Sequence, residues 1–395
     1  MKAAFPKELR QTAIRSLAHQ IVWDWEAGNH KPRVDYRMYL ARVHNVEEGP
    51  LFEDGTIVPV SRRALLGAAG AAVGLSVVGG LPWLASAEPI GASTNVGTAE
   101  IELLQKSAQD LIEMDQRFGA DRLWWLGRGQ LAYVLRLIDL GNYDDAIEQQ
   151  LHSLAGDFTS TLGWFSYDAG LHDEARVYFS EALNRATITQ NDWLAMRTLS
   201  NMARQAVDLG KGREAVKFST SALKKAKENH ASSRAWALLF MREAQGHAKL
   251  GKTDPCNDAL RRAHQAYSRG PRDHDPDWTE FLNDPEMATL EGMCRTDLAQ
   301  HRQAISLLER ACAERDEAHS RNRGMGLGRL AFAAARHGEL DRACDATGRA
   351  LALVEGGMSS ARARAQIRAV GAALDPYRSM PEVRDTTERI RALTA

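Results

Sequence analysis

Apolar residues recur at helical spacing, every three or four positions, from about residue 101 to the end of the chain. Strict alternation of apolar and polar residues, which is typical of a half-buried strand, is almost absent there, and prolines are few. We therefore expect residues 98–395 to form an all-α body built from consecutive amphipathic helices.

A pattern of small residues and glycines recurs in this body. In its clearest copy, Gly163 precedes Gly170, and Ala175, Phe179 and Ala182 follow at steps of five, four and three. A small residue lets two helices approach closely, and a glycine after the first helix can end that helix with a positive φ. This is the tetratricopeptide spacing.

The same spacing recurs along the chain. If the turn residue is taken as an anchor, the anchors are Gly141, Gly170, Gly210, Gly251, Ala299 and Gly338, and the small residues after them are Ala146, Ala175, Ala215, Cys256, Ala304 and Ala343. The copy at Gly141 and Ala146 is the weakest. Several steps between anchors exceed the usual period of about 34 residues. The longest step contains a segment rich in Pro, Asp and Gly, residues 267–286, which we predict to be a solvated loop.

These repeats predict an α-solenoid of about six helix pairs, whose concave surface binds a peptide or a protein segment. Arg197, Arg204 and Arg234 fall on first helices of repeats, the side that usually lines the concave face, so they are candidate ligand contacts. A solvated helix face is the alternative interpretation of these arginines. Aromatic residues at helical spacing, such as Trp164 and Tyr167, are expected in the core rather than in a ligand cage.

The N-terminal part, residues 1–58, is different in character. Residues 1–46 carry eight Lys and Arg residues against four Asp and Glu residues, a modest basic excess. Residues 22–28 predict a short helix that Gly28 closes, followed by a basic turn and a second helix from about Asp35.

This head resembles the second half of an Xre-type, lambda-repressor-like helix-turn-helix. The matching residues are Trp25, Glu26, Gly28, Pro32, Tyr36, Arg37, Leu40, Ala41, Val46, Leu51 and Phe52. Together with the repeats, the whole chain is similar to actinobacterial transcriptional regulators that join such a head to a degenerate tetratricopeptide body.

The resemblance implies that DNA is a partner. In such heads a recognition helix meets base edges in the major groove, which implies base contacts from His19, Gln20 and Trp23. Lys31, Arg33 and Arg37 would then approach phosphates. The chain departs from the pattern before Trp25, where too few residues precede it for the first helix of the motif. A small helical cap that binds no DNA is therefore the alternative.

Residues 59–97 form an Ala- and Gly-rich junction between head and body. Arg62 and Arg63 precede an uncharged run that ends with Ala85 and Ala87, as in a twin-arginine export signal. The run is long enough to cross a bilayer. A targeting segment belongs near a terminus, however, and this one follows a predicted head. We therefore interpret it as a linker, with export as the alternative.

Composition narrows the functional class. Lys and Arg number 50 against 51 Asp and Glu, so the overall charge does not indicate nucleic acid. The four cysteines lie far apart, which supports no zinc site. No phosphate-binding loop, nucleophile elbow or metal-spaced His and Asp cluster is found. We expect no catalytic residue, no metal and no cofactor.

The sequence therefore predicts a cytoplasmic transcriptional regulator with a DNA-binding head and a body that binds a peptide, a small molecule or a protein partner. A second copy of this chain is a further partner to consider, and a membrane is not expected. The alternatives are a tetratricopeptide scaffold that is exported or tethered to a membrane, and a cytoplasmic adaptor without DNA binding.

Overall fold

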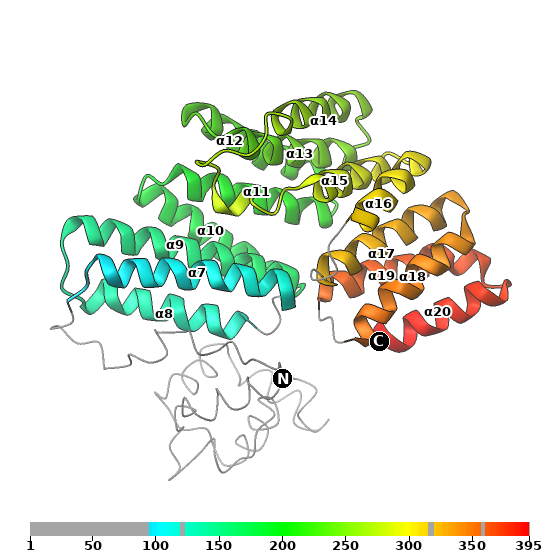
Figure 1. The fold of residues 1–395 in the computed structure, drawn as a ribbon, viewed down its shortest axis with the longest axis horizontal. Helices are drawn as coiled ribbons and strands as arrows, with labels where there is room; N and C mark the ends of the chain where they lie inside the picture. Colours follow the sequence, from blue (N-terminus) through cyan, green and yellow to red (C-terminus); the bar gives the residue numbers. More distant parts are fainter. Residues whose placement is uncertain (1–94, 119–122, 315–319, 357–359, 395) are drawn as a thin grey trace, which may run out of the picture. The chain divides into compact units, whose positions relative to one another are not determined.

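A computed structural model describes residues 95–118, 123–314, 320–356 and 360–394 (Figure 1). The predicted head (1–58) and the junction up to residue 94 lie outside the described residues. The same holds for the candidate DNA contacts His19, Gln20, Trp23, Lys31, Arg33 and Arg37, and for the signal-like residues Arg62, Arg63, Ala85 and Ala87.

The described residues are all-α, as the periodicity predicts, and form no strand. The helices are α7 (Thr98–Phe118), α8 (Trp124–Leu140), α9 (Asp145–Asp168), α10 (His172–Ile188), α11 (Asp192–Asp208), α12 (Gly212–Glu228), α13 (Ser233–Lys249), α14 (Thr253–Tyr267), α15 (Asp284–Asp297), α16 (His301–Glu314), α17 (Ser320–His337), α18 (Leu340–Glu355), α19 (Ala361–Leu374) and α20 (Pro381–Thr394). Two short 3-10 helices, η5 (Asp277–Thr279) and η6 (Asp375–Tyr377), lie in connections. No described helix has the length and apolar character needed to cross a membrane.

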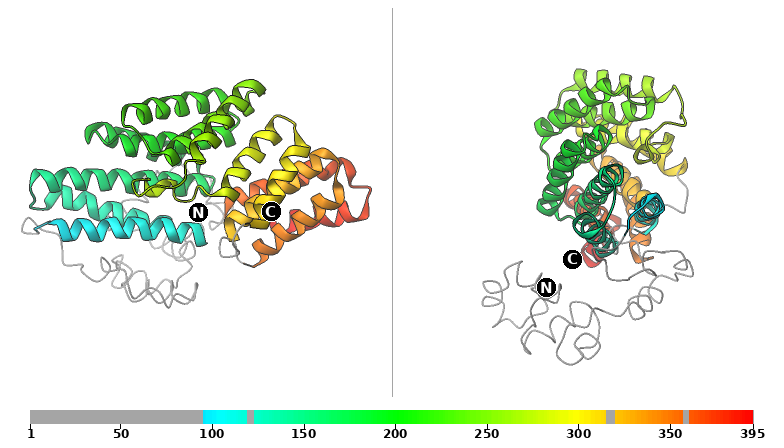
Figure 2. Two further views of the ribbon diagram at one scale, coloured as in Figure 1. Left: turned by 45° about the horizontal axis from the view of Figure 1, so that its top comes forward. Right: turned by 90° about the vertical axis from the view of Figure 1, so that its left-hand side faces the viewer.

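Successive helices pair in antiparallel fashion from α9–α10 to α19–α20, and the pairs stack in chain order (Figures 1 and 2). The first pair, α7 and α8, is joined by side-chain hydrogen bonds such as that from Tyr133 to Glu100, and both of its helices pack against α9. The odd-numbered helices contact one another in sequence, from α7 with α9 to α17 with α19, and so form an inner layer. In addition, α7 contacts α17, which brings the first pair of the stack against the sixth. The body is an α-solenoid of the tetratricopeptide kind whose inner helices partly enclose a groove.

The turns within the pairs confirm five of the predicted anchors. Gly170, Gly210, Gly251 and Gly338 have φ values of 78°, 71°, 67° and 88°, and Ala299 has 58°. At each turn the backbone N–H one residue further on reaches a carbonyl five residues back, for example from Leu171 to Ser166 at 2.8 Å. This is the Schellman arrangement, which satisfies the last carbonyls of the first helix.

The small residues in the helix crossings are also confirmed. Ala175, Ala215, Cys256, Ala304 and Ala343 are fully buried. A side chain on Gly163 would lie 2.6 Å from the ring of Phe179, so the glycine is what lets α9 and α10 approach this closely.

The anchor at Gly141 is wrong. Gly141 has an extended backbone, with φ −73° and ψ 159°, and it lies between α8 and α9, which belong to different pairs. Ala146 is exposed, and its neighbour Ile147 is buried instead. Because α9 is the first helix of the pair that turns at Gly170, it cannot also be the second helix of an earlier pair. The described residues contain seven helix pairs, close to the predicted number of about six.

The predicted loop between α14 and α15 is only partly solvated. Residues 268–283 connect the two helices, as expected, but they contain η5, and both Thr279 and Leu282 are completely buried. Trp278 is half-buried and packs against the cores formed by α11 to α15. The loop therefore forms part of the inner wall of the body.

The left-handed turns give a test of the repeat assignment. Gly251→Ala is expected to destabilise the body by about 1 kcal/mol, since a Cβ there meets no neighbouring atom and only the left-handed backbone is penalised. Ala299→Gly, at the equivalent turn, should stabilise by less than that, because glycine also gains entropy in the unfolded chain. Urea denaturation followed by circular dichroism measures both, and equal signs for the two variants would contradict the assignment.

Candidate functional site

A groove of about 1160 Å³, part of it open to solvent, runs along the inner layer. Every inner helix contributes to its lining, as does the segment around η5. The charged residues that line it are Asp115, Asp168, Arg197, Arg204, Arg242, Asp277, Glu286, Arg321, Arg329 and Arg362. The groove thus joins six arginines to four acidic residues, with aromatic and aliphatic side chains between them.

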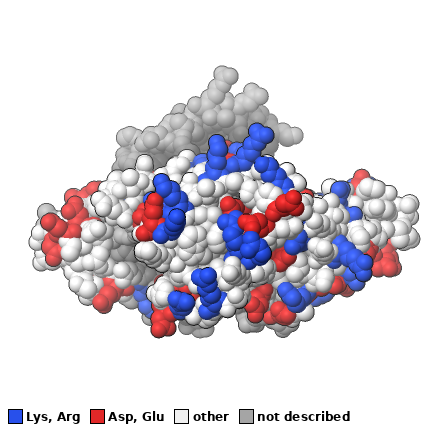
Figure 3. Space-filling view, turned by 90° about the horizontal axis from the view of Figure 1, so that it is seen from above, with Lys and Arg blue, Asp and Glu red and all other residues white. Residues whose placement is uncertain are grey.

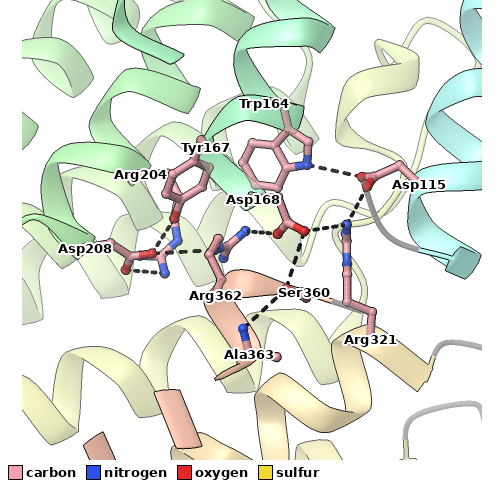
Figure 4. Close-up of polar contacts among 10 residues, drawn as sticks. All are labelled: Asp115, Trp164, Tyr167, Asp168, Arg204, Asp208, Arg321, Ser360, Arg362 and Ala363. Carbon is pink, nitrogen blue, oxygen red and sulfur yellow. Dashed lines mark hydrogen bonds and ion pairs between the residues drawn. The ribbon is translucent and has the colours of Figure 1, made fainter. Parts of the chain in front are cut away.

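Asp168, at the end of α9, is the centre of a buried ionic network (Figure 4). Its carboxylate lies 3.0 Å from Arg362 of α19 and 3.6 Å from Arg321 of α17, and it accepts a hydrogen bond of 3.4 Å from Ser360. Ser360 also caps α19 by accepting from the N–H of Ala363. The network therefore ties the second helix pair to the sixth and seventh pairs.

A second carboxylate continues the network at α7. Asp115 lies 2.6 Å from Arg321 and accepts a hydrogen bond of 3.2 Å from the indole N–H of Trp164. Burial opposes the charge of Arg321, but Asp115 and Asp168 outweigh it and raise the pKa of the guanidinium. Arg321 is therefore a permanent cation that bridges two helices of the first two pairs to α17.

A third carboxylate, Asp208 of α11, holds the other side of Arg362 (Figure 4). It lies 2.6 Å from Arg204 and 3.7 Å from Arg362, and it accepts a hydrogen bond from the hydroxyl of Tyr167. Burial alone would raise the pKa of Asp208, but Arg204 and Arg362 lower it to about 2. The guanidinium of Arg362 also lies over the ring of Tyr167, 4.4 Å from its centroid.

The low pKa of Asp208 predicts a dependence of stability on pH. Because the folded pKa lies below the ordinary value of 3.8, the carboxylate stabilises the folded chain above about pH 4. That contribution is lost as the pH falls from about 4 towards 2. We expect the unfolding midpoint in urea to fall over this range and the fall to be shallower in Asp208→Asn. An unchanged slope in the variant would contradict the assignment.

Two arginines of the groove have no carboxylate partner among the described residues. Arg242 of α13, only 3% exposed, donates to Ser200 at 3.4 Å and to the side chain of Gln245 at 3.0 Å. Burial and the neighbouring Arg204 lower the pKa of Arg242 to about 9. The same two causes lower the pKa of Arg329, on α17, to about 10. Glu286 acts in the opposite direction on both arginines, so this part of the groove holds three arginines, Arg204, Arg242 and Arg329, against two carboxylates, Asp208 and Glu286.

The structure brings two of the three candidate concave-face arginines to the groove. Arg204 belongs to the network, and Arg197 donates a hydrogen bond of 2.9 Å to Thr161 and lies 3.4 Å from Asp157. Arg234 lies elsewhere, because it stands in the first turn of α13 and donates to the carbonyl of Leu282 at 3.1 Å. It borders a separate small depression beside Tyr267.

Several site residues were missed by sequence reasoning. Arg321, Met325 and Arg329 follow one another at a spacing of four residues, so they form one stripe along α17, and this signal was available. Arg362 and Asp168 carried no such signal, since each stands at a helix end far from its partner in sequence. The aromatic residues are divided: Phe165 and Tyr167 are buried, as predicted, whereas Trp164 is partly exposed in the groove.

The outer surface looks different from the groove. In the view of Figure 3, Lys and Arg side chains are interspersed with Asp and Glu side chains and with uncharged surface. No continuous basic area covers that face, which is what a nucleic-acid footprint would require.

Comparison with known proteins finds similarity only among solved structures. No protein family profile matches it, and no curated protein matches it in sequence. Among solved structures, it is similar to a Rap protein complexed with competence and sporulation factor, with 12% identity, a TM-score of 0.46, and coverage of 74% of this chain and 93% of the other. It is also similar to a chain of the APC/C hetero-tetramer Cut9–Hcn1, with 14% identity, a TM-score of 0.38, and coverage of 75% of this chain and 57% of the other.

Proposed function

We propose that this chain is a transcriptional regulator whose solenoid binds a peptide or protein segment in the inner groove and thereby controls a DNA-binding head. The observation that carries the binding role is the groove itself. It is reached by all the inner helices, and its lining combines apolar surface with arginines that lack carboxylate partners. The resemblance of residues 1–58 to an Xre-type head supports the regulatory role.

The ionic network suggests how a ligand could act at a distance. Asp168, Arg321 and Arg362 join the early pairs of the stack to the late ones, and they line the same groove as the proposed ligand site. A ligand that binds one curvature of the solenoid better than another shifts the population towards that curvature. The same shift would change the affinity of the head for DNA.

Peptide binding can be tested with the full chain and a phage-displayed library of random dodecapeptides. We expect enrichment of peptides that bind the wild-type chain and that bind Asn201→Trp much more weakly, since Asn201 is half-buried in the groove wall. Lys224→Trp is the matched control, because the Lys224 side chain is 79% exposed on α12. Equal binding to both variants would exclude the groove as the site.

DNA binding needs a separate test, in which the full chain selects sequences from a random double-stranded library. A regulator should enrich a sequence, and its affinity should fall steeply with salt. Each substitution among Lys31→Ala, Arg33→Ala and Arg37→Ala should then reduce the salt slope by about 0.9 for each phosphate contact that is lost. Failure to enrich any sequence would favour the adaptor without DNA binding.

Localisation separates the exported scaffold from both cytoplasmic alternatives. Fractionation of cells followed by N-terminal sequencing shows where the chain resides and where it begins. A mature chain that starts at Glu88 outside the cytoplasm would overturn the regulator, because the head would have been removed.

A further inference from the structure

The ligand of the groove can be defined further from the charges around α11, α13 and α17. Arg204, Arg242 and Arg329 all line the groove, and Arg204 lies close enough to the other two to lower the pKa of both. Arg204 forms an ion pair with Asp208, whereas Arg242 and Arg329 form no ion pair with a described carboxylate. An anion bound among these three arginines would offset the repulsion between their like charges.

Two buried donors in the same wall have no acceptor. The second terminal nitrogen of Arg204 is buried without a hydrogen-bond partner among the described residues, in a residue that is only 3% exposed. The indole N–H of Trp278, which also lines the groove, is likewise buried and without a partner. An unmade hydrogen bond on a buried donor costs about 1–3 kcal/mol, so a ligand that supplies acceptors here gains that amount.

Apolar and acidic residues beside these donors restrict the class of ligand. Phe281, which is only partly buried, lines the groove as well and offers surface for an apolar side chain. Asp277 and Glu286 are on the same wall, and Glu286 acts on both Arg242 and Arg329. A nucleic acid would bring successive phosphates against these two carboxylates. A peptide can place one carboxylate at the arginines and an apolar side chain beside it.

We propose that the groove binds an acidic peptide, with a carboxylate held by Arg204, Arg242 and Arg329 and an adjacent apolar side chain against Phe281. The indole of Trp278 donates to a carbonyl of the same peptide. This proposal rests on the proposed peptide-binding function and names its ligand class. The carboxylate gains charge-assisted hydrogen bonds in a buried setting, where they are stronger than at the surface.

The first arm of the test analyses the peptides that the full chain selects from the random dodecapeptide library. We expect them to be enriched in Asp and Glu next to Leu, Ile or Phe, relative to the unselected library. Selection on the double variant Arg242→Gln/Arg329→Gln should reduce the acidic enrichment, because only Arg204 is left of the three arginines. The control Arg213→Gln/Arg336→Gln removes two exposed arginines, one of them from α17 itself, and should keep it.

The second arm uses the most enriched peptide, labelled with fluorescein, and its counterpart with every Glu replaced by Gln and every Asp by Asn. Fluorescence anisotropy should show about tenfold or more weaker binding of the neutral peptide to the wild-type chain. In Arg242→Gln/Arg329→Gln the preference for the acidic peptide should be much smaller, because only Arg204 is left to hold the carboxylate; the difference between the two preferences is the interaction energy of the cycle. Circular dichroism confirms that each variant is folded.

The outcomes separate this proposal from the one it rests on. If the selected peptides show no acidic enrichment but still depend on the groove through Asn201→Trp, the acidic ligand is wrong and peptide binding stands. The same conclusion follows if the neutral peptide is weaker by the same factor in Arg242→Gln/Arg329→Gln as in the wild-type chain. If no selected peptide depends on Asn201, both proposals fail.

Discussion

Replacing Asp168 with asparagine is expected to lower the free energy of unfolding of the body by about 3–5 kcal/mol. The substitution keeps the shape of the side chain and removes its charge. Arg362 and Arg321 lie 3.0 Å and 3.6 Å from the carboxylate, and their side chains are only 12% and 7% exposed. Removing one partner leaves their charges without full compensation in a largely buried setting. The midpoint of urea denaturation, followed by circular dichroism, measures the loss.

The position of the loss is as informative as its size. Since Asp168 ties α9 to α17 and α19, hydrogen exchange should rise most in α19, which lies in the last pair of the stack. Helices α13 and α14 have no contact with the network carboxylate and should change less, because pairs in a solenoid respond mainly to their neighbours. A uniform rise in hydrogen exchange over all helices would contradict the role of Asp168 in holding α9 against α17 and α19.

The matched control is Asp345→Asn. Asp345 forms an ion pair of 3.6 Å with Arg349 on α18, but its side chain is 69% exposed. Exposed pairs contribute about 0–1 kcal/mol, so this variant should be close to the wild type. If the two aspartate variants were equally stable, the buried network would not hold the solenoid together.

Gly163→Ala is expected to have the second large effect on stability. Replacing glycine by alanine within a helix ordinarily stabilises a protein, but here we expect the substitution to lower the free energy of unfolding. An added Cβ at residue 163 would lie 2.6 Å from two ring atoms of Phe179, which is itself completely buried. Neither α10 nor the ring can move without disturbing the core, so we expect a loss of about 1–3 kcal/mol. Urea denaturation of the single variants provides the comparison.

Gly129→Ala is the control for the intrinsic helix propensity of alanine relative to glycine. Gly129 lies within α8, and a Cβ there meets no atom within 4 Å, so alanine should stabilise the helix by about 0.5–1 kcal/mol. A rescue variant completes the experiment: Phe179→Leu should reduce the cost of Gly163→Ala, because it removes the ring edge that the new methyl group meets. If Phe179→Leu did not reduce the cost of Gly163→Ala, the contact with the ring of Phe179 would not be the cause of the lost stability.

The local parts of this fold could be predicted from the sequence because their causes are local. Four turns use glycine in a left-handed backbone, and the buried alanines stand at fixed distances after them. Gly141 misled the same reasoning because a glycine can also end a helix in an extended conformation, between pairs rather than within one. To distinguish a turn within a pair from a turn between pairs, one must know which helix each helix packs against, and a single anchor residue does not specify this.

The groove was predictable only in outline. Arg197 and Arg204 were expected on the inner face, since first helices of repeats line it, and the structure places both in the groove wall. Arg234 was expected there for the same reason, but it falls in the first turn of its helix and donates to Leu282 instead. Position along a helix matters as much as the helix to which a residue belongs.

The sequence by itself determined the all-α class, the pairing of helices from residue 145 onward and the small residues at their crossings, because these follow from spacings of a few residues. Only the tertiary structure decided that Asp115 meets Arg321 and that Asp168 meets Arg362, across 206 and 194 residues of chain. The reason is that small rotations from pair to pair add up along a solenoid, and the sum sets which distant helices meet. The same accumulated rotation sets the surroundings of Arg242 and Arg329, which form no ion pair with a described carboxylate.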